Sequence, residues 1–474
     1  MTAQNQSLSP FALLLLVAGQ LLPQIDFSIV NVALDVMGSA LQTHESGLVL
    51  IVALYALSFA TLIATGARLG DRYGRKRIFM LGIIGFGITS AICGFATSIT
   101  AMLAGRLLQG VFGALMMPQI LATIHATLTG ERHSRAVGIY TAVAGLSVAF
   151  GQMLGGWLVS ANIAGLGWRL AFFINIPVCV LILAFGSMVI PETKADHQPH
   201  MDISGSALLA LSLLCLLIPV AMGQHWPYLW LLLPGLFPAI YWLWKTETRK
   251  EAANAQPLLP PSLFKTPLLL IGLTGEIAVT LTYSGYIFIT AFCLQSQIHF
   301  TPMQSGNTFI ALGLSFFAGS LLSKPISQRL GHFINFNVGC VMTFAGFILT
   351  IGLFRLFGQN LQAYDFLLAT ALIGFGNALM ITAAFRIALT HVTQRHAGET
   401  SSLIVTLQQG CFALGTAAVG AMYSATLSQG YQAAITSATG GLCVVLLLIG
   451  VYIFTRRPRQ VTPVSPANAT AMTD

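Results

Sequence analysis

The chain has 474 residues, of which 55% are hydrophobic and only 8% are charged, whereas soluble domains carry roughly 25% charged residues. So few charged side chains cannot cover a globule of this size, and the composition therefore excludes most soluble enzymes and DNA-binding factors and indicates a surface that faces lipid. The formal charge of +8 comes from Lys and Arg in short groups between apolar runs rather than on one face, so it does not predict nucleic-acid binding.

Apolar runs long enough to cross a bilayer recur along the whole chain. A membrane helix needs about 20 predominantly apolar residues, and the sequence divides into fourteen such runs. They lie near residues 11–33, 47–67, 78–97, 101–124, 135–159, 170–190, 203–222, 226–244, 268–293, 305–323, 334–354, 363–386, 403–426 and 434–455. The sequence therefore predicts an all-α membrane protein with 14 transmembrane helices.

The basic residues orient these runs. With the N-terminus inside, 18 of the 22 Lys and Arg residues fall in cytoplasmic segments, and only Arg169 and Arg355 fall on the opposite side. Cytoplasmic loops of membrane proteins carry such an excess. We therefore expect a multi-pass membrane protein with both termini in the cytoplasm.

Short sequence echoes relate the two ends of the chain. Gly110–Met116 resembles Gly374–Met380, and Asp71–Gly74 has a weaker echo in Gln328–Gly331, although chance is a rival explanation for short glycine-rich matches. Duplicated halves are typical of transporters, in which substrate binds between the repeats. We expect an N-terminal six-helix bundle in residues 1–190, two inserted helices with cytoplasmic linkers in 191–267, a C-terminal six-helix bundle in 268–456 and a cytoplasmic tail in 457–474.

Three charged residues stand out inside the apolar runs, namely Asp26, Arg106 and Glu276. A charge at the bilayer centre costs at least about 2.5 kcal/mol, so such residues are candidates for function. Asp26 is about 22 Å into a span that starts inside and Arg106 about 8 Å into one that starts outside, so in a core about 30 Å thick they reach the same depth. Because proton loss strengthens the attraction of Asp26 to Arg106 or to a cationic substrate, the pair predicts a proton-coupling site, and a static salt bridge is the alternative.

The loop after the second run, Gly66–Arg77, has the sequence GARLGDRYGRKR. Glycines allow a tight return between two helices, and an acid among bases can pair with arginines in one conformational state and release them in another. The alternative is that the bases only fix the topology. The loop resembles the signature of the major facilitator superfamily, and the matching residues are Gly66, Gly70, Asp71, Arg72, Gly74 and Arg75.

Three further stretches resemble the 14-span drug:proton antiporters of that superfamily. The first run contains DFSIVNVAL (Asp26–Leu34), the fourth contains GRLLQG (Gly105–Gly110), and the sixth begins with GWRLAFFINIP (Gly167–Pro177). With the matching number of runs, the resemblance covers the whole chain. It implies two six-helix bundles related by a pseudo-twofold axis, two inserted central helices, and multidrug efflux in exchange for protons. It also implies a multi-pass protein of the bacterial cytoplasmic (inner) membrane.

The fifth run resembles the superfamily's antiporter motif, in which small residues let helices approach closely and a Gly-Pro pair kinks the helix. Gln152 stands where the proline of that motif is expected, and this departure leaves import or export open. Ordinary small-residue packing is the alternative. The residues of this antiporter-like motif are Gly145, Gly151, Gln152, Gly155 and Gly156.

Aromatic residues follow Glu276 along the ninth run. Glu276 offers a second buried acid from the other half of the chain, and Tyr283 and Tyr286 lie seven and ten residues beyond it. These two rings are candidates to line an aromatic cavity for a lipophilic cation. The alternatives are a hydrogen-bonded helix contact for Glu276 and packing or lipid-facing positions for the tyrosines.

Together these features predict a secondary active transporter that works by alternating access, and not an enzyme. The resemblance implies proton-coupled efflux of amphipathic or cationic drugs or antiseptic-like molecules, and hence antibiotic resistance. The alternative within transport is a proton-coupled or facilitative carrier of one specific metabolite. A membrane sensor or a membrane-embedded enzyme is less favoured, because no connection is long enough for a signalling domain and no nucleophiles or metal ligands converge.

The expected partners follow from the same features. The seven cysteines lie in apolar stretches without paired spacing, and no Walker-type sequence occurs, so we expect neither a metal nor a cofactor. The resemblance to drug:proton antiporters implies that the proton gradient is the energy source. We expect a monomer that binds a small-molecule substrate, protons and the lipid bilayer, and no nucleic acid.

Overall fold

The computed structural model describes residues 8–43, 45–194, 202–223, 226–253, 255, 257–390 and 397–457, and no β-strand occurs among them. The N-terminal part contains α1 (Pro10–Ala40), α2 (Glu45–Tyr73), α3 (Arg75–Phe95), α4 (Ile99–Thr127), α5 (Gly130–Ala161), α6 (Leu170–Phe173) and α7 (Asn175–Val189). The middle contains α8 (Ile203–Met222), the 3-10 helix η3 (Pro227–Gly235), α9 (Leu236–Ala252) and the 3-10 helix η4 (Pro261–Lys265). The C-terminal part contains α10 (Pro267–Ser296), α11 (Pro302–Asn307), α12 (Ile310–Leu330), α13 (His332–Phe357), α14 (Leu367–Leu389), α15 (Ala397–Thr426) and α16 (Tyr431–Thr455).

Each apolar run predicted from the sequence coincides with one helix or with two consecutive helices. In the part of the chain that the structure describes, twelve helices are long and apolar enough to cross a membrane. The protein is therefore an all-helical, multi-pass integral membrane protein. The 32-residue α5 and the 17-residue α9 are not among those twelve, so the count of 14 spans and the cytoplasmic location of the termini stay predictions.

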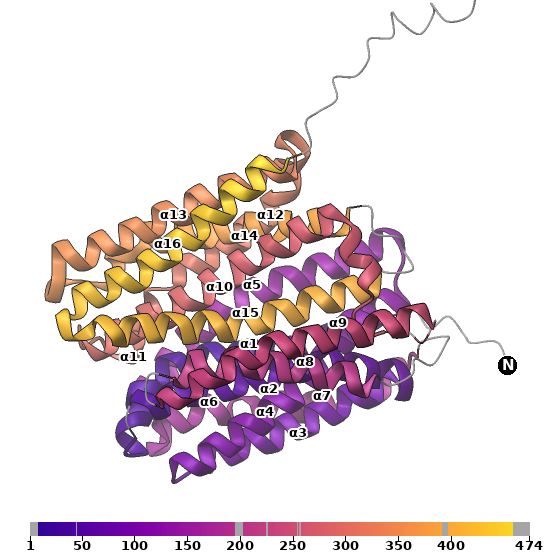
Figure 1. The fold of residues 1–474 in the computed structure, drawn as a ribbon. Coiled ribbons are helices and arrows are strands. Elements are labelled where there is room, and N and C mark those ends of the chain that lie inside the picture. Colours follow the sequence, from indigo (N-terminus) through magenta and orange to yellow (C-terminus); the bar gives the residue numbers. More distant parts are fainter. Residues whose placement is uncertain are drawn as a thin grey trace, which may run out of the picture.

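The helices gather into two groups with a pair between them. In Figure 1, the indigo and purple helices α1 to α4, α6 and α7 lie together, and the orange and yellow helices α12 to α16 lie on the other side. Helix α5 packs against α1 but lies beside α10 in this view and also contacts α11 and α12. The pair α8 and α9 crosses the seam, where α8 packs against α2 of the first group and α15 of the second. Of the predicted linker and tail, residues 195–201 and 458–474 lie outside the described residues.

Close helix contacts occur at the echoed glycines. A Cβ on Gly110 of α4 would lie 2.3 Å from a backbone oxygen of α2, and a Cβ on Gly374 of α14 would lie 2.0 Å from a backbone oxygen of α12. Gly74 and Gly331, from the weaker echo, adopt φ angles of 111° and 82° before the next helix. Glycine populates such positive φ without steric cost. The two groups of helices thus use equivalent glycines for equivalent contacts.

Successive long helices run in opposite directions, so the connections lie at two ends of the molecule. The signature-loop end contains Gly66–Arg77 and the linker between α9 and α10. The opposite end contains the turns from α1 to α2, from α3 to α4 and from α10 to α11. This division gives the reference frame for the site.

Candidate functional site

A buried ion pair joins the first and fourth helices. The Nη1 atom of Arg106 on α4 contacts the Oδ2 atom of Asp26 on α1, and both side chains are fully buried. The contact confirms that the two residues share a depth. Because removing one partner of a buried pair leaves an uncompensated charge, the pair holds α1 and α4 together.

Neutral side chains complete the surroundings of Asp26. Its Oδ1 atom accepts hydrogen bonds from the Nε2 atom of Gln109 on α4 at 2.9 Å and from the Nδ2 atom of Asn175 on α7 at 3.0 Å. Both amides also donate to the hydroxyl of Ser90 on α3, at 2.9 and 3.2 Å. Asp26 of α1 is therefore held by donors from two other helices: Arg106 and Gln109 of α4 and Asn175 of α7.

Arg106 is fixed at several atoms. Its Nε atom donates to the carbonyl of Ile51 at 3.0 Å, and its Nη1 atom donates to Gln109 Oε1 at 2.7 Å. The guanidinium carbon lies 4.2 Å from the centre of the Tyr55 ring, a favourable cation–π distance. Its Nη2 atom is buried without a hydrogen-bond partner among the described residues. The positive charge is thus held in place, with one donor left over.

Glu276 on α10 has a simpler environment than Asp26. It is fully buried, and its Oε2 atom accepts a hydrogen bond from the Nε2 atom of Gln408 on α15 at 2.8 Å. Its Oε1 atom is buried and has no partner among the described residues. No arginine or lysine forms an ion pair with Glu276 in that part of the chain. The second buried acid therefore keeps an open acceptor and lacks a fixed cation.

The two predicted tyrosines face different helices. The Tyr286 hydroxyl lies 3.1 Å from Thr350 Oγ1 on α13, and its ring centre lies 5.3 Å from that of Phe347. The Tyr283 ring centre lies 6.1 Å from that of Phe316 on α12, and its hydroxyl is buried without a partner among the described residues. Tyr286 thus packs inside the C-terminal group of helices, with its hydroxyl close to Thr350. The Tyr283 hydroxyl is the one of the two whose hydrogen-bonding capacity is unused among the described residues.

The acid of the signature loop pairs within the loop. The Oδ1 atom of Asp71 accepts from Arg75 Nη2 at 2.7 Å and from Arg75 Nε at 3.0 Å. Arg75 Nη1 also donates to the carbonyl of Ala122 on α4 at 3.2 Å. Arg72 lies over the ring of Tyr73 instead, at 5.4 Å. Asp71 and Arg75 therefore link the α2–α3 turn to the end of α4.

The loop's glycines let α2 lie directly on α4. A Cβ on Gly66 would lie 2.2 Å from the carbonyl oxygen of Ala114, and a Cβ on Gly70 would lie 1.8 Å from Gln119 Oε1. Gln119 Nε2 in turn donates to the Gly66 carbonyl at 2.8 Å. The acid and the glycines thus make specific contacts between helices, which a loop that only fixed the topology would not need.

The antiporter-like motif of α5 contacts both groups of helices. Cβ atoms on Gly151 and Gly155 would lie 2.7 and 3.0 Å from atoms of α1. On the next position, a Cβ on Gly156 would lie 2.5 Å from the carbonyl oxygen of Pro302 on α11. A Cβ on Gly306 of α11 would lie 2.4 Å from the carbonyl oxygen of Gln152. The motif thus joins the two groups at the opposite end. Gly145, its remaining residue, lies in the middle of α5.

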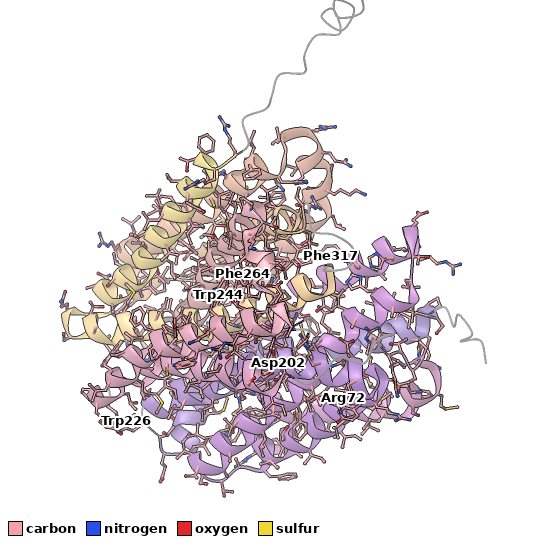
Figure 2. All side chains as sticks on the ribbon, turned by 45° about the vertical axis from the view of Figure 1, so that its right-hand side comes forward. Arg72, Asp202, Trp226, Trp244, Phe264 and Phe317 are labelled. Carbon is pink, nitrogen blue, oxygen red and sulfur yellow. The ribbon has the colours of Figure 1, made fainter. Side chains whose placement is uncertain are left out.

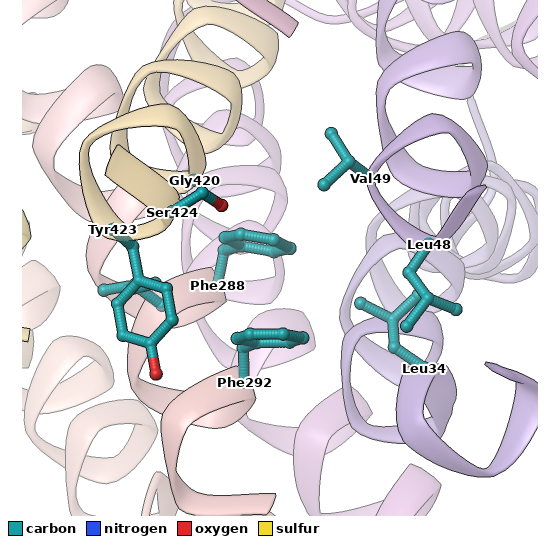
Figure 3. A pocket seen from close by; sticks show the side chains of 9 residues that line it. Leu34, Leu48, Val49, Phe288, Phe292, Gly420, Tyr423 and Ser424 are labelled. Atoms are coloured by element: carbon teal, nitrogen blue, oxygen red, sulfur yellow. The ribbon is translucent and has the colours of Figure 1, made fainter. Parts of the chain in front are cut away.

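A small cavity lies at the same end, between α1, α2, α10 and α15. Figure 3 shows aromatic side chains of one group facing aliphatic side chains of the other. The cavity measures about 20 Å³, far below the roughly 300–1,000 Å³ of ligand pockets. The cavity is therefore too small to hold a drug-sized ligand in this structure. The labelled lining residues are Leu34, Leu48, Val49, Phe288, Phe292, Gly420, Tyr423 and Ser424.

Comparison with known proteins connects this arrangement to transport. The sequence profile of the Major Facilitator Superfamily matches residues 16–416. The chain is 29% identical over 435 residues to the probable actinorhodin transporter of Streptomyces coelicolor, with 90% of this chain and 74% of that protein covered. It is also 29% identical over 415 residues to the tetracenomycin C resistance and export protein of Streptomyces glaucescens, with 87% and 76% covered.

A solved structure shares the fold. An auto-inhibited peptide transporter of the POT family superposes with a TM-score of 0.67, covering 97% of this chain and 99% of that chain. The two sequences are 18% identical. At that identity the likeness concerns the arrangement of the helices alone.

Proposed function

This chain belongs to the Major Facilitator Superfamily, and on that premise we propose that it exports amphipathic or cationic small molecules, such as antibiotics or antiseptics, in exchange for protons. The observation that carries the proposal is the fully buried Asp26–Arg106 pair. The names of the relatives, a probable actinorhodin transporter and a tetracenomycin C resistance and export protein, support a small-molecule substrate, and the second name supports export. The site lies in a transporter rather than in an enzyme.

Burial links the protonation of Asp26 to the conformation. In this structure Asp26 has no exposed surface, so a proton reaches it only when the helices around it separate. Protonation removes its attraction to Arg106 and leaves Gln109 and Asn175 donating to a neutral acid. The contacts that join α1 to α4 and α7 then weaken, which favours the other conformation.

Glu276 is the proposed contact for a cationic substrate. It offers a buried oxygen without a partner among the described residues, and Gln408 is a neutral neighbour. A substrate cation would supply the charge that neutralises the carboxylate, and a proton would compete with it. Neutral amphipathic substrates would bind while Glu276 is protonated.

The structure represents a state closed at the opposite end, because α5 and α11 meet there. With the sidedness expected from the basic residues, this end is the periplasmic one.

Fusion proteins test that sidedness. A reporter active only in the cytoplasm should work when fused after Arg457, and a periplasmic reporter should work near residue 225. A periplasmic C-terminus would contradict the count of 14 spans.

The signature loop yields a second expected result. Asp71→Asn removes the ion pair with Arg75 but leaves the substrate contacts intact. We expect normal insertion and an export rate lowered about threefold to tenfold, because the lost interaction belongs to a conformational state. Initial efflux rates, normalised to the amount of protein in the membrane, measure the effect. Unchanged rates would reduce the loop to a topology signal.

Efflux assays test the proposal as a whole. Cells that lack their own pumps should export dyes and quaternary ammonium compounds when they express this protein, and collapse of the proton gradient should stop that export. Counterflow in proteoliposomes with and without a pH gradient then distinguishes an antiporter from a facilitative carrier. Export that persists without a gradient, or transport of one metabolite alone, would overturn the proposal.

A further inference from the structure

Two buried carboxylates hold the linker between α9 and α10 at the signature-loop end. Asp202 lies at the N-terminus of α8, and its side chain is 3% exposed. Glu247 lies near the C-terminus of α9 and is 1% exposed. Neither residue belongs to the site described above. Buried acids far from that site require a separate explanation, because burying a carboxylate is unfavourable unless partners compensate for it.

The partners of these acids are backbone amides of the linker. The amide of Leu258 donates to Asp202 Oδ2 at 3.0 Å, and the amide of Leu259 donates to Glu247 Oε2 at 2.7 Å. Lys250 Nζ contacts Asp202 Oδ1. We call Asp202, Glu247, Lys250 and linker residues 257–259 the linker latch.

The other side of the linker contacts the N-terminal group of helices. A guanidinium N–H of Arg68, at the end of α2, donates to the carbonyl oxygen of Pro257. The linker then continues through η4 into α10, which carries Glu276. Trp244 of α9 and Phe264 of η4 pack edge to face with ring centres 5.7 Å apart; Figure 2 labels both residues near each other. The latch therefore ties the start of α10 to α9 and to the end of α2.

The charges around Glu247 make the latch sensitive to protons. Among the described residues, Asp202 and Lys250 are the charged groups that face Glu247, so there two carboxylates share one ammonium group. The two carboxylates lie against the same glycine, because a Cβ on Gly205 would lie 2.4 Å from Glu247 Oε1 and 2.7 Å from both oxygens of Asp202. Glu247 Oε1 has no hydrogen-bond partner among the described residues. A proton on this oxygen removes the repulsion between the acids and supplies a donor to Asp202.

The remaining charges nearby have other contacts. Glu251, one turn further along α9, accepts from the amide of Ser262, and Arg68 lies beyond Pro257. Lys265 of η4 is exposed. These groups do not share the buried space between Asp202 and Glu247.

We propose that Glu247 is a cytoplasmic acid sensor, whose protonation tightens the linker latch and thereby slows the exchange of the transporter between its two conformations. The proposal rests on the proposed sidedness, which places the latch in the cytoplasm. An antiporter that carries protons inward acidifies that side. The latch then limits transport when the cytoplasm becomes too acidic.

The direction of the pH effect follows from the two states of Glu247. Burial, and then the neighbouring Asp202, raise the pKa of Glu247 from 4.5 to about 7 in the latched state. Burial also opposes the ionisation of Asp202, but hydrogen bonds from Lys250, Gly205 and Leu258 outweigh it and lower the pKa of Asp202. When the linker is released into water, Glu247 regains its ordinary pKa. The latched state therefore binds the proton more tightly, and its stability falls as the pH rises from 4.5 to about 7.

Hydrogen exchange on the full-length protein in lipid discs tests the latch without any substrate. After correction for intrinsic rates, the Leu258 and Leu259 amides should exchange about tenfold more slowly at about pH 6 than at about pH 8. Glu247→Gln imitates the protonated acid and should exchange slowly at both pH values. Glu251→Gln is the matched control and should behave as the wild type. Equal protection at both pH values in the wild type would overturn the proposal, whatever the protein transports.

Transport gives the second measurement. In proteoliposomes, counterflow of a quaternary ammonium dye is followed while only the pH on the cytoplasmic face changes. At about pH 8, Glu247→Gln should be at least about threefold slower than the wild type and should depend less on that pH. Glu251→Gln should match the wild type. A Glu247→Gln variant that shows slow exchange but a wild-type transport rate would refute the link between latch and transport.

Discussion

Replacing Asp26 with asparagine should abolish uphill, proton-driven efflux of a cationic substrate and should leave part of the exchange that needs no energy. Asparagine keeps the shape of the side chain, and its carbonyl oxygen still accepts from Gln109 or Asn175, but it does not titrate. Because residue 26 then no longer binds and releases a proton in each transport cycle, the pH gradient can no longer drive the accumulation of substrate. Accumulation ratios in proteoliposomes with an imposed pH gradient measure this result.

Arg106→Ala acts differently, because it leaves Asp26 buried without its cation. Removing one partner of a buried pair costs about 3–5 kcal/mol, so this variant should lower thermal stability in detergent and impair both uphill efflux and exchange. Asp35→Asn is the matched control, because Asp35 lies on the same helix and is exposed. If Asp26→Asn still pumps uphill with an unchanged pH dependence, the pair is a static salt bridge and the coupling site lies elsewhere.

Gly156→Val should block transport by preventing closure of the opposite end. The added Cβ would lie 2.5 Å from the carbonyl oxygen of Pro302, and backbone on both sides leaves nothing that can rotate away. We expect efflux to fall at least about tenfold with normal membrane insertion, because the closed state is needed in every cycle. Gly352→Val in α13 is the control, since a Cβ there meets nothing within 4 Å.

Crosslinking shows whether closure itself is lost. The amide of Met303 donates to Ser160 Oγ at 3.2 Å across the same interface, so a cysteine pair at these two positions should crosslink in the closed state. The pair should crosslink far less when combined with Gly156→Val and as well as before when combined with Gly352→Val. Full crosslinking alongside lost transport would assign the defect to another step of the cycle.

The sequence predicts the helices of this protein well, because the length of an apolar run is set by the thickness of the bilayer. The helices extend beyond the runs, as α1 does from Pro10 to Ala40 against a predicted 11–33, because backbone hydrogen bonds continue outside the apolar part, up to the amide of Leu41 that donates to the carbonyl of Met37 at 2.8 Å. Depth follows from the same arithmetic, so the contact between Asp26 and Arg106 was predictable. Which way a helix is rotated does not follow from it.

Rotation and long-range contact explain what the sequence does not show. Gln109 and Asn175 belong to motifs that were recognised, but a neutral amide in an apolar run carries no signal of what it binds. Tyr283 and Tyr286 are three residues apart and so share a broad face of α10, but their neighbours differ: Tyr283 lies against Phe316 of α12, and Tyr286 lies against Thr350 of α13. Glu247 resembles a solvated acid at a helix end, and its burial depends on a linker that folds back from the next helix.

The order of synthesis gives the Asp26 network a role before any transport begins. Asp26 enters the membrane with the first helix, but Arg106 follows 80 residues later and Asn175 follows 149 residues later. Until then the acid faces the bilayer alone, at a cost of about 2.5–3.5 kcal/mol. The first helix therefore gains its full stability in the membrane only after the fourth and seventh helices have arrived. Biogenesis of the N-terminal half thus ends in a concerted step, in which helices made at different times become stable together.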